Sequence, residues 1–127
     1  MSYRKTFRYK NLNFPVEDNE DVTFTVDFIS DVNTSYTLVD IPSDNDPEID
    51  DEGTAELGKG NTLRSEKTVV VCDVDNLSDL EDRIKINFLV NDEVIVAFDE
   101  PKSVEPRPII VLKIKFPAPC KNFVFLL

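Results

Sequence analysis

The sequence contains no histidine and no tryptophan. Histidine is the commonest general base, the usual activator of serine and cysteine nucleophiles, and the commonest side-chain ligand of transition metals. Paired carboxylates can hydrolyse glycosidic bonds without histidine, but a chain that lacks tryptophan lacks a common aromatic platform for sugars. These absences predict a protein that is not an enzyme.

Positive charge is scarce. The chain has 14 Lys and Arg against 25 Asp and Glu, a formal net charge of −11. Nucleic-acid binding requires clustered basic residues that neutralise phosphates, and anionic membrane surfaces repel an acidic protein. The basic residues of 4–10 form only a small group. The charge therefore argues against nucleic acid and anionic lipid as partners.

Long apolar runs are also missing. Met1 to Lys5 are not followed by the apolar core of a signal peptide, and no run approaches the length of a membrane span. We expect a chain that is cytoplasmic when made and does not insert into membranes. In that compartment Cys72 and Cys120 are predicted to be reduced core thiols rather than a disulfide.

The apolar residues that are present alternate with polar ones. Val22, Phe24, Val26 and Phe28 are separated by Thr23, Thr25 and Asp27, the period of a half-buried strand. Other segments with strand character are bounded by turn residues. The predicted strands are 3–10, 22–28, 35–41, 68–74, 84–90, 94–98, 109–116 and 122–127.

This pattern predicts an all-β fold, with residues 1–127 forming one antiparallel β-sandwich of about eight strands and at most one short helix. A barrel is less consistent with the unequal connections. Residues 84–98 are predicted to form a hairpin around Asn91, Asp92 and Glu93. The valine-rich segment 68–74 is predicted to be a central strand buried on both faces. Residues 76–83 fit either one or two helical turns or a polar loop.

Residues 58–60 read Gly-Lys-Gly, a spacing that does not match a phosphate-binding loop. We expect a tight hairpin turn there.

Fourteen acidic residues and no Lys or Arg lie between Glu17 and Gly58, most densely in 40–53. Uncompensated carboxylates repel one another unless solvent, a cation or a basic partner compensates them. The sequence leaves these three open. If the acidic loop meets a second loop drawn from the acids of 73–82, the oxygen ligands could hold calcium. The predicted metal ligands are Asp44, Asp46, Asp50, Asp73 and Asp75.

The C-terminal residues are apolar on both faces of the strand they would form. They are Phe123, Val124, Phe125, Leu126 and Leu127. A sandwich strand normally exposes one polar face. The segment is therefore either covered within its own chain or docked on another subunit by strand addition. We predict an interface.

These features predict a non-enzymatic structural or adaptor subunit that binds protein partners, or copies of itself, within a larger assembly. A virion or a contractile injection particle is the kind of assembly expected, by fold-level analogy. One alternative is a calcium-dependent binding module that uses acidic loops at one end of the sandwich. Another is an acidic inhibitor or immunity-like protein that caps a basic partner. No cofactor is expected, with calcium as the exception.

Overall fold

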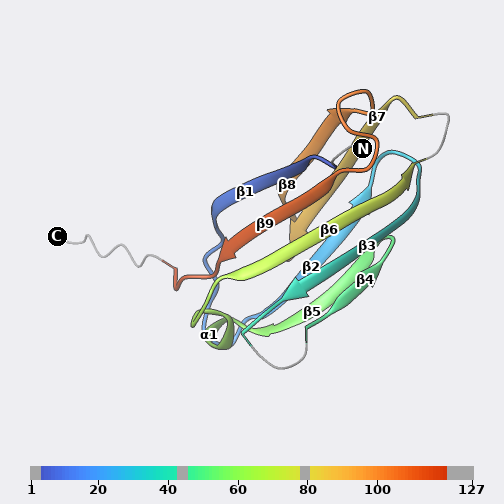
Figure 1. The fold of residues 1–127 in the computed structure, drawn as a ribbon. Coiled ribbons are helices and arrows are strands. Elements are labelled where there is room, and N and C mark those ends of the chain that lie inside the picture. The colour runs from blue at the N-terminus through green and yellow to red at the C-terminus, as the bar shows by residue number, and fades with distance from the viewer. Residues whose placement is uncertain (1–3, 43–45, 78–80, 120–127) are drawn as a thin grey trace.

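The computed structural model describes residues 4–42, 46–77 and 81–119, which form nine strands and one short helix. Two sheets lie face to face (Figure 1), and this confirms the predicted all-β sandwich. The elements are β1 (Thr6–Asn13), β2 (Asp21–Phe28), β3 (Val32–Asp40), β4 (Glu48–Asp50), β5 (Gly53–Lys59), α1 (Gly60–Leu63), β6 (Thr68–Leu77), β7 (Arg83–Val90), β8 (Glu93–Pro101) and β9 (Ile109–Lys115).

The larger sheet has five strands in the order β1-β9-β6-β3-β4, and the smaller has four in the order β5-β2-β7-β8. β1 runs parallel to β9, while every other pair in the two sheets is antiparallel. The chain crosses between the sheets several times, so strands distant in sequence become neighbours. The strand order places β6 at the centre of the five-stranded sheet.

The alternation predicted for β2 is confirmed. Val22, Phe24 and Val26 are fully or almost fully buried, and Phe28 packs partly against the same core. The phenyl rings of Phe24 and Phe88 stack with centroids 6.0 Å apart and an interplanar angle of 23°. The alternating apolar residues of β2 therefore point into the core between the two sheets.

The predicted hairpin is also confirmed. β7 and β8 are joined by Asn91 and Asp92, whose φ angles are 48° and 67°. Two consecutive residues with positive φ are typical of the type I′ turn, which matches the twist of the two strands. Asn91 also accepts a hydrogen bond from the Thr23 backbone N–H at 2.9 Å, which ties the turn to β2.

The Gly-Lys-Gly segment is not the hairpin turn that we predicted. Gly58 and Lys59 end β5, and Gly60 begins α1. A Cβ atom on Gly60 would lie 2.1 Å from the Glu17 carbonyl oxygen, so only glycine fits this close approach. The glycines permit an edge strand to turn into a helix at the base of the sandwich.

The strand assignment from the sequence differs from the structure at two further places, one of which lies partly outside the described residues. β4 and β5 were not predicted, because β4 has only three residues, two of them acidic, and β5 contains Gly53 and Gly58, which are atypical of strands. Within 76–83, residues 76 and 77 belong to β6 and 83 belongs to β7, while 78–80 lie outside the described residues. The short helix that the structure describes is at Gly60–Leu63 instead.

The valine-rich strand β6 is central, as predicted, but it is not buried on both faces. Val70, Cys72 and Val74 point into the core and are fully buried. Val69 and Val71 point the other way and are only half-buried. The outer face of the five-stranded sheet thus presents apolar side chains at its centre.

Candidate functional site

Two of the predicted metal ligands, Asp73 and Asp75, are held by arginines. The Arg4 guanidinium forms an ion pair with Asp73, and Arg107 pairs with Asp75 at 3.0 Å. Arg4 also donates to the Val74 carbonyl at 3.1 Å. The Asp73 hydrogen bond raises the pKa of Arg4 further above its usual value. These carboxylates fasten β1 and the loop before β9 to β6.

Glu105 completes the same network. Its carboxylate accepts hydrogen bonds from the backbone N–H groups of Lys5 at 2.5 Å and Arg107 at 3.0 Å. The Lys5 hydrogen bond is the largest cause that lowers the pKa of Glu105. The end of the sandwich near Asp73 is therefore an ion-pair clamp rather than an open set of oxygen ligands.

The other predicted ligands lie elsewhere. The Asp46 carboxylate caps the backbone N–H of Ile41 at 3.1 Å, beyond the opposite end of β3. Asp50 is separated from Asp73 by Tyr36, since Tyr36 pairs with both. Asp44 lies outside the described residues. Within 4–42, 46–77 and 81–119, no three His, Cys, Asp or Glu side chains are grouped to hold a metal ion.

The predicted C-terminal interface, Phe123–Leu127, also lies outside the described residues. The described core ends with Phe116, which is fully buried. The C-terminal hypothesis therefore stays a prediction.

An apolar stripe runs across the outer face of the five-stranded sheet. Leu38 pairs with Val71, which pairs in turn with Val111. Tyr36 is 41% exposed and Leu38 is 37% exposed. We define the apolar stripe as Tyr36, Leu38, Val69, Val71, Ile109 and Val111. Because opposite residues on paired strands point to the same face, these six side chains share the outer face. Val111 is buried there, Val69, Val71 and Ile109 are half-buried, and Asp73 lies between Tyr36 and Ile109.

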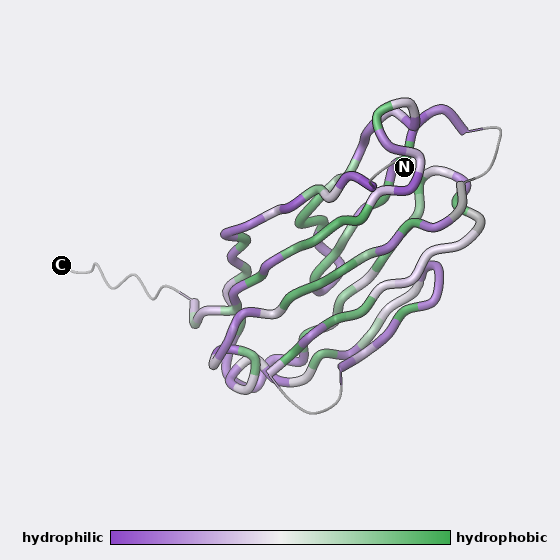
Figure 2. Tube along the Cα trace, in the orientation of Figure 1, coloured by the Kyte–Doolittle hydropathy of each residue, from purple (hydrophilic) through white to green (hydrophobic). Residues whose placement is uncertain are grey.

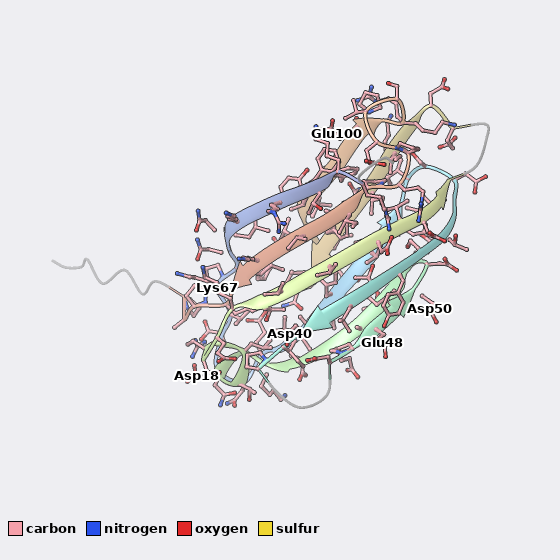
Figure 3. All side chains as sticks on the ribbon, in the orientation of Figure 1. Asp18, Asp40, Glu48, Asp50, Lys67 and Glu100 are labelled. Carbon is pink, nitrogen blue, oxygen red and sulfur yellow. The ribbon has the colours of Figure 1, made fainter. Side chains whose placement is uncertain are left out.

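The stripe has an acidic border on the side of β3 and β4. Asp40, Glu48 and Asp50 are exposed, and Figure 3 shows them along this side of the sheet. Glu48 pairs with Leu38 and Asp50 pairs with Tyr36, so the acids directly flank the stripe. The Tyr36 hydroxyl donates to the Glu48 carboxylate. We call Asp40, Glu48 and Asp50 the acidic edge.

The opposite side, formed by β1 and β9, is basic. Arg8 pairs with Val111, and Lys113 pairs with Val69. Figure 2 shows hydrophobic segments through β6 and β9, with hydrophilic segments along β1 and β4. We define the basic edge as Arg8, Lys10, Lys67, Lys113 and Lys115.

A hollow of about 320 Å³ extends the basic edge at the base of the sheet. Lys67 and Lys115 line it together with Arg64 and Phe116. Arg64 pairs with Asp18 and donates to the Val16 carbonyl at 2.7 Å. The arginine therefore holds the fold together, while the two lysines leave positive charge at the surface.

The two charged edges are not neutralised by each other. Among the residues that the structure describes, no member of either edge takes part in an ion pair within 4.0 Å. β6 and its neighbours hold the edges apart. The outer face of the five-stranded sheet is thus an apolar stripe between opposite charges, and we call the whole surface the docking face.

The thiol of Cys72 is not poised for chemistry. It is fully buried on the inner face of β6, where burial raises its pKa to about 11 and the neighbouring Thr37 hydroxyl partly opposes the shift. A nucleophilic cysteine needs a thiolate near neutral pH. This free cysteine serves as a core residue, as the valine run around it predicted.

No family model, no curated protein and no solved structure matches the chain. Helix α1 spans Gly60–Leu63, and no helix in the described residues is long and apolar enough to cross a membrane. The docking face therefore has to be interpreted from its own chemistry.

Sequence reasoning missed the docking face, although the sequence carried a signal for it. In β3, Tyr36 and Leu38 alternate with Ser35, Thr37 and Val39, so large apolar residues occupy the parity opposite to the core. The same holds for Val69 and Val71 in β6. Apolar residues on both faces of a strand predict that both faces are buried. Here the described residues bury only the inner face of the five-stranded sheet.

Proposed function

We propose that this chain is a non-enzymatic structural or adaptor subunit that joins a larger protein assembly through the docking face. The observation that supports the proposal is the partly exposed apolar stripe around Leu38 and Val71, which lies between two charged edges. Interfaces combine an apolar centre with a polar rim, and this face has that arrangement.

The free energy of burying apolar surface favours contact between the docking face and another surface. Burying apolar surface gains about 25 cal/mol per Å², and Leu38 and Tyr36 still expose more than a third of their surfaces. Lone exposed apolar residues are common, but a contiguous patch with a charged rim indicates a contact surface. The absence of histidine and the raised pKa of Cys72 support a role without catalysis.

Site-specific photo-crosslinking in the cells that make the protein tests this proposal. A photoreactive residue would replace Leu38, and a matched control would replace Val94, which is 52% exposed on β8 of the other sheet. We expect discrete protein adducts from position 38 and none from position 94. Val71→Lys should suppress the adducts, because Val71 is the direct neighbour of Leu38.

The proposal fails if position 38 forms no protein adduct, if position 94 forms the same adducts, or if Val71→Lys leaves them unchanged. The first result would mean that the docking face contacts solvent in the cell. The other two would mean that the adducts do not depend on the docking face. A circular-dichroism spectrum and a thermal melt of the Val71→Lys protein would check that the variant remains folded.

A further inference from the structure

We propose that the occupant of the docking face is a second copy of this chain, related by a two-fold axis parallel to β6. This inference rests on the proposed function, because it names the partner for the same surface. The order of acidic, apolar and basic residues across the five-stranded sheet supports this inference.

The strand register arranges the outward side chains in rows that cross the sheet. One row runs Glu48, Leu38, Val71, Val111 and Arg8. The next runs Asp40, Val69 and Lys113. Each of these two rows begins with an acid on β3 or β4, passes through a valine of β6, and ends with a base on β9 or β1. A third row runs Asp50, Tyr36, Asp73, Ile109 and Thr6; it has no base at its end, and its central Asp73 is ion-paired with Arg4. β6 is the middle strand of the five.

A two-fold axis along β6 reverses each row and places it over itself. Glu48 of one copy then faces Arg8 of the second copy, and Asp40 faces Lys113. Val71, Val69 and Asp73 lie along the axis and meet their own counterparts. The ion pair with Arg4 offsets the charge of each Asp73, while Tyr36 faces Ile109 of the second copy. A closed dimer needs a self-complementary surface of this kind, and opposite charges that meet across an interface favour association.

The alternative axis, which runs across the strands, gives the opposite result. It would place Glu48 over Glu48 and Arg8 over Arg8. Like charges in contact oppose association, so this arrangement is disfavoured. The charge pattern therefore selects one orientation, with the strands of the two facing sheets nearly parallel.

The expected dimer is weak and reversible. Five strands about 4.8 Å apart, with about seven residues of roughly 3.3 Å each, cover roughly 500 Å². Stable interfaces bury about 800 Å² per partner. Two copies with a net charge of −11 also repel each other at long range. At physiological salt the Debye length is about 8 Å, which screens that repulsion more than the close contacts.

Charge reversal in the full-length chain tests the dimer. Sedimentation over a concentration series at physiological salt would give the dissociation constant. Glu48→Arg alone and Arg8→Glu alone should each weaken the dimer by about tenfold. The double variant should restore the wild-type constant. Within one chain the two positions are four strands apart, so a rescue must come from contact between copies.

Glu56→Arg with Lys85→Glu provides the matched control. These exposed residues lie on β5 and β7 of the four-stranded sheet, and we expect the control pair to leave the dissociation constant unchanged. Single variants that weaken the dimer without rescue in the double variant would overturn the proposed axis. Control variants that weaken it equally would overturn the proposed surface.

A wild-type chain that stays monomeric at every concentration would overturn the dimer. Photo-crosslinking at position 38 then separates the two proposals. An adduct with a different protein would support a docking subunit without self-association, whereas no adduct would remove both proposals. An intrachain adduct to 122–127, with dimers only after that segment is deleted, would show that the chain covers its own face and would likewise overturn both.

Discussion

Glu48 and Arg8 lie at opposite ends of one cross-strand row on the five-stranded sheet. Four inter-strand steps of about 4.8 Å separate them, roughly 19 Å. This exceeds the Debye length of about 8 Å at physiological salt. Arg8 therefore does not neutralise Glu48 within the same chain, and the acidic edge keeps its mutual repulsion.

We expect the melting temperature to rise between low and moderate NaCl, because salt screens repulsion among the acidic residues between Glu17 and Gly58, which we call the acidic window. Among the described residues, only Asp18 and Asp21 of this window are ion-paired. Glu48→Gln with Asp50→Asn should raise the low-salt melting temperature and reduce the salt effect. A melting temperature that does not change across this NaCl range would mean that basic residues of the fold already neutralise these acids.

Phe24→Ala should lower the free energy of unfolding by about 3–5 kcal/mol, since it removes a fully buried ring from the core. The loss includes the stacking of Phe24 on Phe88. Thr25→Ala is the matched control, because Thr25 points outward to the Thr54 hydroxyl at 2.8 Å. Urea unfolding would measure both. Equal effects of the two substitutions would contradict the strand register.

Cys72 should make the protein less stable as the pH rises from about 8 to about 10. The unfolded thiol ionises near its usual pKa of about 8.5, whereas burial raises the pKa of the folded thiol to about 11. The unfolded state therefore loses its proton first, and stability falls with rising pH. Urea unfolding would show a steeper decline for the Cys120→Ser protein than for Cys72→Ala with Cys120→Ser. Equal slopes would mean that Cys72 is not protected by burial.

Deleting residues 122–127 should leave the sandwich folded, because the described core ends with Phe116. If this apolar segment is an interface, the deletion should also weaken association. Circular dichroism and sedimentation of the truncated chain would separate these effects. A truncated chain that does not fold would assign the segment to the core, and one that associates normally would exclude it as an interface.

The sequence was sufficient to predict the sandwich where the two faces of a strand differ. Val22, Phe24 and Val26 alternate with polar residues, and that contrast fixes which side faces the core. β4 spans only Glu48–Asp50, and its single buried residue, Ile49, gives too short a pattern to recognise. Short acidic edge strands form because a neighbouring strand holds them, and local sequence does not report that neighbour.

The charged rows of the docking face could not be predicted because they depend on strand order. Glu48 and Arg8 are on one row only because β9 and β6 lie between β1 and β3. The valines of β6 indicate an apolar outer face, but the sequence does not say whether the same chain covers it. The predicted calcium ligands assumed that two acidic loops meet at one end of the sandwich, whereas Asp73 and Asp75 are paired with Arg4 and Arg107.

The most direct test of the proposed dimer through the docking face is a series of two-dimensional NMR spectra of the full-length chain at increasing concentration. We predict that the amide signals of Leu38, Val71 and Val111 shift together with concentration, while those of Thr25 and Asn87 on the four-stranded sheet stay fixed. Fixed signals across the docking face, or shifts confined to the four-stranded sheet, would contradict the account.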